Sequence, residues 1–242
     1  MATLVEQLAA YGARDAVREL PPEVVHHAKR AVIDWFAALY PGTRVSPAVN
    51  LVQAHAAELG VGRSSLPGFG TTAFPATAAW INGSASHSVE FDDIFRDAVY
   101  HPGCPVIAAA LALAEDRGLS GRDLLAAITV GYEISTRIGA AVQPSHYRFF
   151  HTTGTVGVFG GAAAAAALLA PGHVGVMRHA LATAGTFASG LQQAFRSDAM
   201  TKPLHAGHAA SVGVTSAMAA ASGVTGASDI LEGEAGFGAA MS

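Results

Sequence analysis

The sequence predicts an all-α fold, and two observations support that prediction. Apolar residues recur at the three- and four-residue spacing of helices in most segments, and proline or glycine stands where one such segment ends. In addition, no segment of four to eight residues alternates in the manner of a strand with β-branched enrichment. We therefore expect residues 1–242 to form a single multi-helix domain without internal repeats or linkers.

Four helices are expected in the first part of the chain, with ranges of 3–13, 24–39, 47–59 and 75–87. Prolines open three of them, because the fixed backbone angle of proline suits the first helical turn. Pro21-Pro22 precedes the second helix, Ser46-Pro47 supplies an N-cap and the first residue of the third, and Pro75 starts the fourth. Residues 60–74 are rich in glycine, serine and proline and are expected to form a loop.

Five more helices are expected after residue 103, with ranges of 104–117, 124–142, 152–169, 174–190 and 203–222. Ser120 followed by Asp123 resembles a capping box ahead of the second of these helices. Pro144 and Pro171-Gly172 end two others, and Gly223 is placed to form the C-cap of the last one.

The composition favours a protein that buries much of its surface. Hydrophobic residues make up 51% and the mean hydropathy is +0.35, but the excess is alanine, and His, Ser, Thr or Gly interrupts the long apolar runs. We therefore expect no membrane span. Only 13% of the residues are charged. Such a chain should hide apolar surface in an oligomer, and we expect a two-fold homodimer, which is the commonest form.

The charge and the cysteine content limit the kinds of partner and the cellular compartment that we expect for this protein. The net charge is −4 and no basic patch with interleaved aromatic residues occurs, so we expect no nucleic-acid partner. Cys104 is the single cysteine, which excludes an internal disulfide and fits a reducing compartment. The N-terminal residues lack the charged and apolar regions of a secretory signal, and a cytoplasmic location is the expectation.

One polar stretch, residues 87–103, interrupts the apolar segments. It holds four carboxylates, two histidines, an arginine and a tyrosine within seventeen residues: Glu90, Asp92, Asp93, Asp97, His87, His101, Arg96 and Tyr100. A polar loop between rigid helices is a common position for residues that reach a substrate. The alternative is a helix connection whose acids cap helix ends and pair with the arginine.

His151 and Lys202 are further candidates. His151 precedes the alanine-rich helix, where the positive end of the helix dipole favours a neutral imidazole, as a general base requires, and attracts an anion. The alternative is a histidine that only caps the helix. Lys202, one of two lysines, is expected just outside the last helix, before Pro203, where it suits binding of an anionic ligand. The alternative there is a solvated lysine.

Neither a metal nor a cofactor is expected. His205 and His208 share a helix face and could bind a metal, but the chain has neither a His-Glu-x-x-His motif nor a cysteine cluster. The glycines of residues 154–161 do not follow a predicted strand. They are therefore more typical of close helix packing than of a dinucleotide-binding turn.

Eight short motifs, in order along nearly the whole chain, resemble the MmgE/PrpD family, which includes 2-methylcitrate dehydratase, cis-aconitate decarboxylase and iminodisuccinate epimerase. They are Ile81-Asn82-Gly83 with His87, Phe91-Asp92-Asp93, His101-Pro102, Ala112-Leu113-Ala114-Glu115, Gly131-Tyr132-Glu133, Phe150-His151-Thr152-Thr153, Thr201-Lys202-Pro203-Leu204-His205-Ala206-Gly207, and Leu231-Glu232-Gly233 with Gly236-Phe237. The resemblance implies a helical domain that forms one side of a site for small di- or tricarboxylic acids.

The resemblance also implies roles for individual residues. The expected catalytic group is His101, His151, Asp92 and Asp93, and the expected substrate contacts are Lys202, His205, Tyr147 and Thr152. Which residue of Glu90, Asp92 and Asp93 is the active-site acid stays open. The implied activity is that of a cofactor-independent lyase or isomerase, in which a histidine removes a proton next to a carboxylate of a small anionic substrate.

Members of this family carry, after the helical half, a smaller α+β lid domain that closes over the site. The motifs found here belong to the helical half, and residues that the lid supplies are not expected in this chain. The alternative function is therefore that of a truncated, catalytically inactive helical module for dimerisation or binding.

Overall fold

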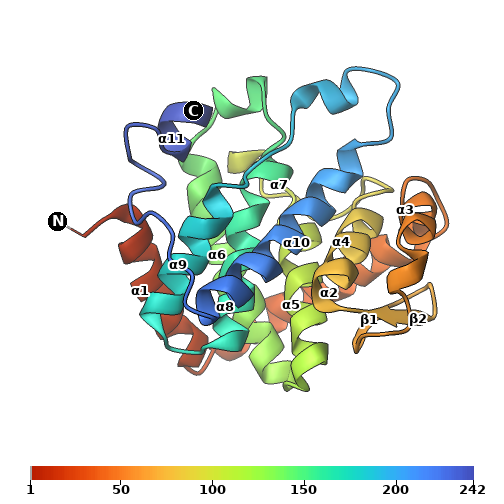
Figure 1. The fold of residues 1–242 in the computed structure, drawn as a ribbon, viewed down its shortest axis with the longest axis horizontal. Helices are drawn as coiled ribbons and strands as arrows, with labels where there is room; N and C mark the ends of the chain where they lie inside the picture. The colour runs from red at the N-terminus through yellow and green to blue at the C-terminus, as the bar shows by residue number, and fades with distance from the viewer. Residues whose placement is uncertain (1) are drawn as a thin grey trace.

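The computed structural model describes residues 2–242 and is almost wholly helical, which confirms the predicted all-α fold (Figure 1). The helices are α1 (Leu4–Val17), α2 (Pro22–Gly42), α3 (Ala48–Ala54), α4 (Pro75–Ser86), α5 (Gly103–Arg117), α6 (Gly121–Ala141), α7 (Thr152–Thr155), α8 (Gly157–Leu169), α9 (Val174–Gly185), α10 (Lys202–Ala221) and α11 (Phe237–Met241). Within the described residues, sheet is confined to one antiparallel hairpin of β1 (Ser64–Leu66) and β2 (Thr71–Ala73).

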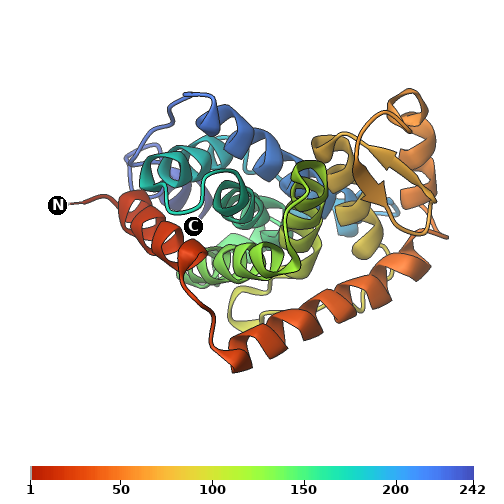
Figure 2. The same cartoon turned by 90° about the horizontal axis from the view of Figure 1, so that it is seen from below.

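The central helix is α8. Its residues 157–168 are all buried, and it packs against α5, α6, α9 and α10 (Figure 2). Small residues allow this close packing, as Gly213 of α10 illustrates: a Cβ atom there would lie 2.4 Å from the carbonyl carbon of Gly161. The small alanine and glycine residues therefore let the helix backbones come close together.

The hairpin lies in the segment that we predicted to be a loop. It sits beside α4 and α5, while α2 runs along the outer edge of the bundle (Figure 2). Glu115 of α5 holds the hairpin, because its carboxylate accepts the backbone N–H of Ser65 at 2.6 Å and the Ser65 hydroxyl at 2.7 Å. Strands of three residues are too short to show alternation, and the contact that holds them is distant in sequence.

The ends of several elements differ from the predictions. Helix α1 continues to Val17, α3 starts after Pro47 and ends at Ala54, α9 ends at Gly185 before the predicted 190, and α11 was not predicted. The predicted helix caps at Ser120 and Gly223 are confirmed. Ser120 and Asp123 form the capping box of α6, and Gly223 follows α10 with a φ of +94°, a conformation that glycine adopts readily.

One helical stretch, Thr152–Leu169, is long and apolar enough to cross a membrane by length and composition alone. However, 94% of it is buried inside the fold. Burial of this kind is typical of a core helix.

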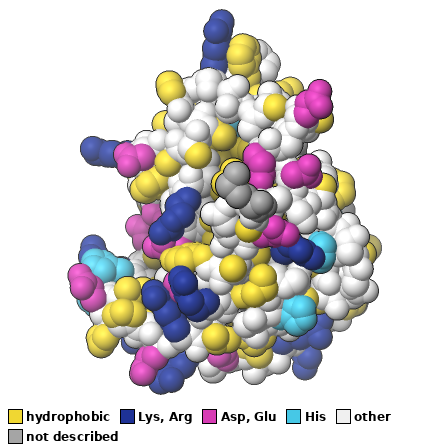
Figure 3. Space-filling view, turned by 90° about the vertical axis from the view of Figure 1, so that its left-hand side faces the viewer, with side chains coloured by type: hydrophobic (Ala, Val, Ile, Leu, Met, Phe, Trp, Pro, Cys, Tyr) yellow, Lys and Arg dark blue, Asp and Glu magenta, His cyan; other side chains and the backbone are white. Residues whose placement is uncertain are grey.

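The surface keeps some apolar side chains exposed. Those more than half exposed include Val17, Ile33, Phe91, Leu191 and Met200. On the face around the N-terminus, hydrophobic side chains are interspersed with acidic and basic ones (Figure 3). Scattered exposed residues are normal on a protein surface, so the homodimer stays a prediction.

Three loops converge at one end of the bundle, the upper end in Figure 1. They are residues 87–102 before α5, residues 142–151 before α7 and residues 186–201 before α10. Two of them are joined directly, since Phe150 forms an isolated bridge with Leu191 and the N–H of His151 donates to the Gly190 carbonyl at 2.8 Å. The polar segments singled out in the sequence therefore share one end of the fold.

Candidate active site

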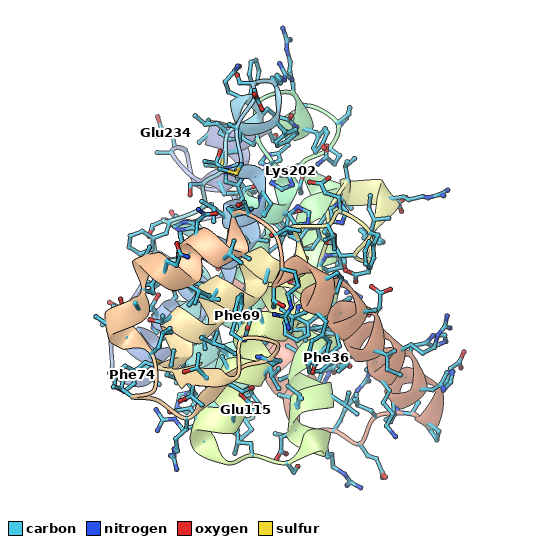
Figure 4. All side chains as sticks on the ribbon, turned by 90° about the vertical axis from the view of Figure 1, so that its right-hand side faces the viewer. Phe36, Phe69, Phe74, Glu115, Lys202 and Glu234 are labelled. Atoms are coloured by element: carbon cyan, nitrogen blue, oxygen red, sulfur yellow. The ribbon has the colours of Figure 1, made fainter. Side chains whose placement is uncertain are left out.

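Four histidines and a lysine meet where the loops converge. His87 is the C-cap of α4, His101 precedes α5 by two residues, His151 is the N-cap of α7, and His205 lies in the first turn of α10. The ring of His87 lies between two predicted catalytic residues, with centroids 4.9 Å from His101 and 5.5 Å from His151. Lys202 is the first residue of α10, not outside the helix as predicted, and Figure 4 places it at this end.

The buried carboxylate of Asp92 connects two of these histidines. Its Oδ2 atom accepts a hydrogen bond from His87 Nδ1 at 2.9 Å and one from the Cys104 thiol at 2.8 Å. His101 Nδ1 lies 3.1 Å from the same oxygen, in a charge contact that falls outside good hydrogen-bond geometry. The Asp92 side chain is only 2% exposed, so all three contacts are made inside the fold.

The charge of Asp92 biases His101 toward its protonated form. Burial of Asp92 by itself would raise the pKa of that carboxyl, but the contacts with His101 and His87 outweigh burial and hold the pKa well below its usual range. Burial would likewise lower the pKa of His101, yet the adjacent Asp92 carboxylate raises it overall. A histidine that favours its protonated form is suited to donate a proton as a general acid.

His151 has the opposite bias. It is 1% exposed, and its Nδ1 lies 3.1 Å from Nδ1 of His205, so one of the two rings donates and the other accepts. Burial, followed by the neighbouring His87, His205 and Lys202, holds the pKa of His151 well below its usual range. Burial also lowers the pKa of His205, to about 4. Both histidines therefore favour the neutral form, which a general base needs.

Lys202 is engaged by two neighbours from other segments. Its ammonium forms an ion pair with the carboxylate of Glu90 and lies 5.2 Å from the ring centroid of Phe195. Phe195 also packs edge-on against His151, with ring centroids 5.1 Å apart. The Phe195 ring therefore contacts both Lys202 and His151.

Asp93 points elsewhere. Its Oδ1 accepts the backbone N–H of Gly103, the first residue of α5, at 2.9 Å, and its Oδ2 accepts the hydroxyl of Tyr132 at 2.8 Å. Burial is the main reason why the pKa of Asp93 rises to about 6. Among the three acids left open by the sequence, Asp92 contacts the histidines, Glu90 contacts the lysine, and Asp93 anchors α5.

Two of the expected substrate contacts are not brought into the histidine cluster. Thr152 is fully buried, and its hydroxyl accepts from Gln143 Nε2 at 3.1 Å. The neighbouring Thr153 is the one that reaches the cluster, since its hydroxyl accepts the backbone N–H of His101 at 3.2 Å. Tyr147 lies in the 3-10 turn His146–Arg148 and forms no hydrogen bond with any described histidine.

Sequence reasoning assigned no role to His87, Cys104 or Phe195. His87 was recognised as a motif residue and as the start of the polar stretch, so a signal existed for it. Cys104 stood out as the single cysteine, but nothing local linked it to Asp92, which lies twelve residues earlier. Phe195 carried no signal, because its contacts come from α7 and α10.

Three side chains of this cluster are of the types that bind metal ions. Donor atoms of His87, Asp92 and Cys104 lie within 4.8 Å of one another. However, burial and then the charge of Asp92 raise the pKa of the Cys104 thiol well above its usual value, so the thiol is a hydrogen-bond donor to the carboxylate. His205 and His208 diverge: the first pairs with His151 and the second lies 3.3 Å from the Phe187 carbonyl.

A large cavity lies away from this cluster. Its volume is about 980 Å³, and it is bounded by the α1–α2 connection, α2 and the start of α6, with Ile33, Lys29 and Arg122 in its wall. None of the histidines discussed above lines it. The chemistry of the cluster, and not the size of this cavity, identifies the candidate site.

Comparison with known proteins agrees with the motifs. The family model of the MmgE/PrpD N-terminal domain matches residues 6–242. Cis-aconitate decarboxylase of Homo sapiens is 34% identical over 92% of this chain and 47% of its own length, and the Mus musculus protein of the same name is 32% identical over 92% and 46%. Cis-aconitate decarboxylase of Aspergillus terreus is 29% identical over 95% of the chain and 48% of its own length.

The chain thus spans about half the length of the curated relatives it matches. The match nevertheless covers both the polar stretch that contains Asp92 and the segment that contains Lys202. On the family model and on these relatives, the chain belongs to the MmgE/PrpD family.

Proposed function

We propose that this chain provides the acid–base residues of a lyase that acts on small di- or tricarboxylic acids without a metal or a cofactor. One observation carries the proposal: His101, His151 and Lys202 meet at one end of the bundle, and the two histidines are biased toward opposite protonation states. Groups whose environments move their pKa values apart are suited to the roles of acid and base.

Decarboxylation is the favoured reaction, because relatives that match 92% and 95% of the chain carry the name cis-aconitate decarboxylase. In a decarboxylation of an unsaturated acid, the bond from carbon to one carboxylate breaks and CO₂ leaves. The electron pair shifts into the double-bond system, and a chain carbon takes up a proton. Protonated His101 is the proposed donor of that proton, and Lys202 the proposed partner of the substrate carboxylate on which charge builds.

Dehydration and epimerisation are the other reactions that the site could support. Both begin with removal of a proton next to a carboxylate, and neutral His151 is the proposed base for that step. The anion that forms needs the same cationic partner, Lys202. These reactions differ from decarboxylation in which bond breaks next, so their products distinguish them.

The substrate carboxylate has to replace Glu90 on Lys202. Glu90 is suited to leave, because its side chain is 49% exposed and ion pairs with such an exposed partner are weak. Its φ of +60° lies in the left-handed region, which is unfavourable for glutamate. We infer that Glu90 occupies the anion position of Lys202 when no substrate is bound.

A second candidate function, a helical binding or dimerisation module without activity, is favoured by one observation. His151 is only 1% exposed in this chain, and Phe195 packs against its ring. If Phe195 does not move, a substrate held by Lys202 cannot reach His151.

The proposed homodimer is checked separately by light scattering at micromolar concentration, where a monomer would contradict it.

The test is incubation of the purified chain with cis-aconitate in D₂O, followed by ¹H NMR. Decarboxylation yields a product that has lost CO₂ and carries deuterium on carbon, whereas deuterium uptake without loss of CO₂ indicates proton exchange alone. His101→Gln and His151→Gln are expected to lower the rate by about 10²-fold or more. Lys202→Ala is expected to weaken binding more than turnover, because the lysine also holds the ground state.

His26→Gln is the matched control, since His26 is an exposed histidine of α2. Loss of CO₂ at equal rates in wild type and in both site-histidine variants would reject the proposed roles. Binding of citrate by calorimetry without any turnover would support the binding module instead. If citrate does not bind and no acid reacts, the proposed activity and the binding module are both rejected, and only the dimerisation module is left for light scattering to test.

A further inference from the structure

We propose that Asp92, held by His87 and Cys104, is a positioning residue that keeps His101 in one tautomer, with Nδ1–H turned inward and Nε2 open to the ligand. The inference deepens the proposed function and rests on it in one respect, namely the role of His101 as proton donor. The arrangement of the four side chains does not depend on that role.

Three side chains converge on one oxygen atom of Asp92. Oδ2 of Asp92 lies 2.9 Å from His87 Nδ1, 2.8 Å from Cys104 Sγ and 3.1 Å from His101 Nδ1. A carboxylate can only accept, so His87 and Cys104 donate to it, while its negative charge favours a hydrogen on the nearby Nδ1 of His101. A lone pair on Nδ1 of either histidine would instead face the lone pairs of the oxygen.

The two ring nitrogens of His101 have different surroundings. Nδ1 is buried, and the nearest acidic oxygen is that of Asp92. Nε2 is not among the buried atoms without a partner, and the His101 side chain is 18% exposed. The partner of one ring nitrogen decides the state of the other. The charge of Asp92 at 3.1 Å favours a hydrogen on Nδ1, which leaves Nε2 as the nitrogen that meets a ligand.

Asp92 is itself held in place by buried neighbours. His87 is fully buried and is held at the end of α4, with its ring stacked on that of His151 at an interplanar angle of 16°. Cys104 lies in the first turn of α5 and is also fully buried. The adjacent Asp93 is tied to Gly103 and Tyr132. The carboxylate of Asp92 is therefore held by two rigid helices and has little freedom to turn away.

The side chains of His87 and Asp92 are 0% and 2% exposed, and both contact the more exposed His101. The proposed effect of Asp92 passes through His101, which is what a positioning role means. This role explains why a buried acid, a buried histidine and the single cysteine of the chain meet at one point. A buried carboxylate without donors would be strongly unfavourable.

The test is histidine NMR on the ¹⁵N-labelled 242-residue chain, which requires no enzymatic activity. The His101 signals are assigned by their loss in His101→Gln. Long-range ¹H–¹⁵N correlation at a pH where His101 is neutral is expected to report the Nδ1–H tautomer for His101 and for His87. Free imidazole side chains prefer the other tautomer, so an Nε2–H form of His101 in the wild type would overturn the proposal even if no variant folds.

The second measurement is the titration of His101 in Asp92→Asn, which keeps the size of the side chain and removes its charge. The groups that face His101 are Asp92 and Asp93 from its loop, His87 from α4, His151 from α7 and Lys202 from α10. Loss of the closest carboxylate is expected to lower the pKa of His101 by about one unit or more.

Asp97→Asn is the control, since Asp97 is an exposed acid of the same loop. It removes the same charge and is expected to leave the titration of His101 almost unchanged. Equal shifts in the two variants would mean that Asp92 acts only through net charge, which rejects the positioning role. If the tautomer and the shift are as expected but cis-aconitate is not turned over, the positioning stands and the proposed function fails.

Discussion

Lys202 and Glu90 form an ion pair although they are 112 positions apart in the chain. The lysine is the first residue of α10, and the glutamate comes from the loop after α4. The ion pair places the Glu90 carboxylate on Lys202, which is the proposed partner of a substrate carboxylate. Glu90 therefore occupies the proposed binding position.

Glu90→Gln is therefore expected to strengthen the binding of citrate. The variant removes the carboxylate that competes for Lys202 and keeps the shape of the side chain. Because a half-exposed ion pair contributes about 0–1 kcal/mol, the dissociation constant should fall by up to about fivefold. Calorimetric titration checks this, with Glu234→Gln, an acid near the C-terminus in Figure 4, as the control. Weaker binding in Glu90→Gln would show that Glu90 contributes to the ligand site.

His205→Gln is expected to flatten the dependence of stability on pH between about 4 and 6.5. In the wild type, burial lowers the pKa of His205 to about 4, whereas the unfolded chain takes up that proton near the ordinary value of 6.5. Between these values the unfolded state binds more protons, so stability falls as the pH falls. Thermal unfolding at a series of pH values measures the slope, and an unchanged slope in the variant contradicts the assignment.

Tyr132→Phe tests the anchoring role of Asp93. The variant removes the hydroxyl that donates to Asp93 Oδ2 at 2.8 Å and leaves a buried acceptor without its partner. The free energy of unfolding at pH 7 should fall by about 1–3 kcal/mol. Urea denaturation measures the loss, and the His101 titration is the second readout. A large change in that titration would show that Asp93 belongs to the histidine cluster after all.

Gly213→Ala tests the close approach of α10 and α8. The added Cβ would lie 2.4 Å from the carbonyl carbon of Gly161, so the two helices have to separate. We expect a loss of about 1–3 kcal/mol in unfolding free energy, the usual effect of overpacking. Gly121→Ala is the matched control, because a Cβ at Gly121 meets nothing within 4 Å. Equal stability of the two variants would mean that the helices adjust without strain.

Several features could be read from the sequence because their causes are local. Helix periodicity and the capping box of Ser120 and Asp123 depend on residues within a few positions of one another, and the all-α fold follows from them. Rarity was also informative: Lys202 and His151 stood out in apolar surroundings, and both lie in the cluster. The hairpin was missed because Glu115, which holds it, is about fifty positions away.

The identity of the partners was decided by tertiary structure alone. Asp92 and Asp93 are adjacent and chemically identical, yet one contacts His87 and His101 while the other contacts Gly103 and Tyr132. Likewise the hydroxyl of Thr153 accepts the backbone N–H of His101, whereas the hydroxyl of Thr152, an expected substrate contact, accepts from Gln143. Successive side chains point in different directions, and which direction meets a histidine depends on how α4, α5 and α7 pack. The sequence by itself determined the helices and the set of candidate residues, whereas the packing of distant helices determined which candidates meet.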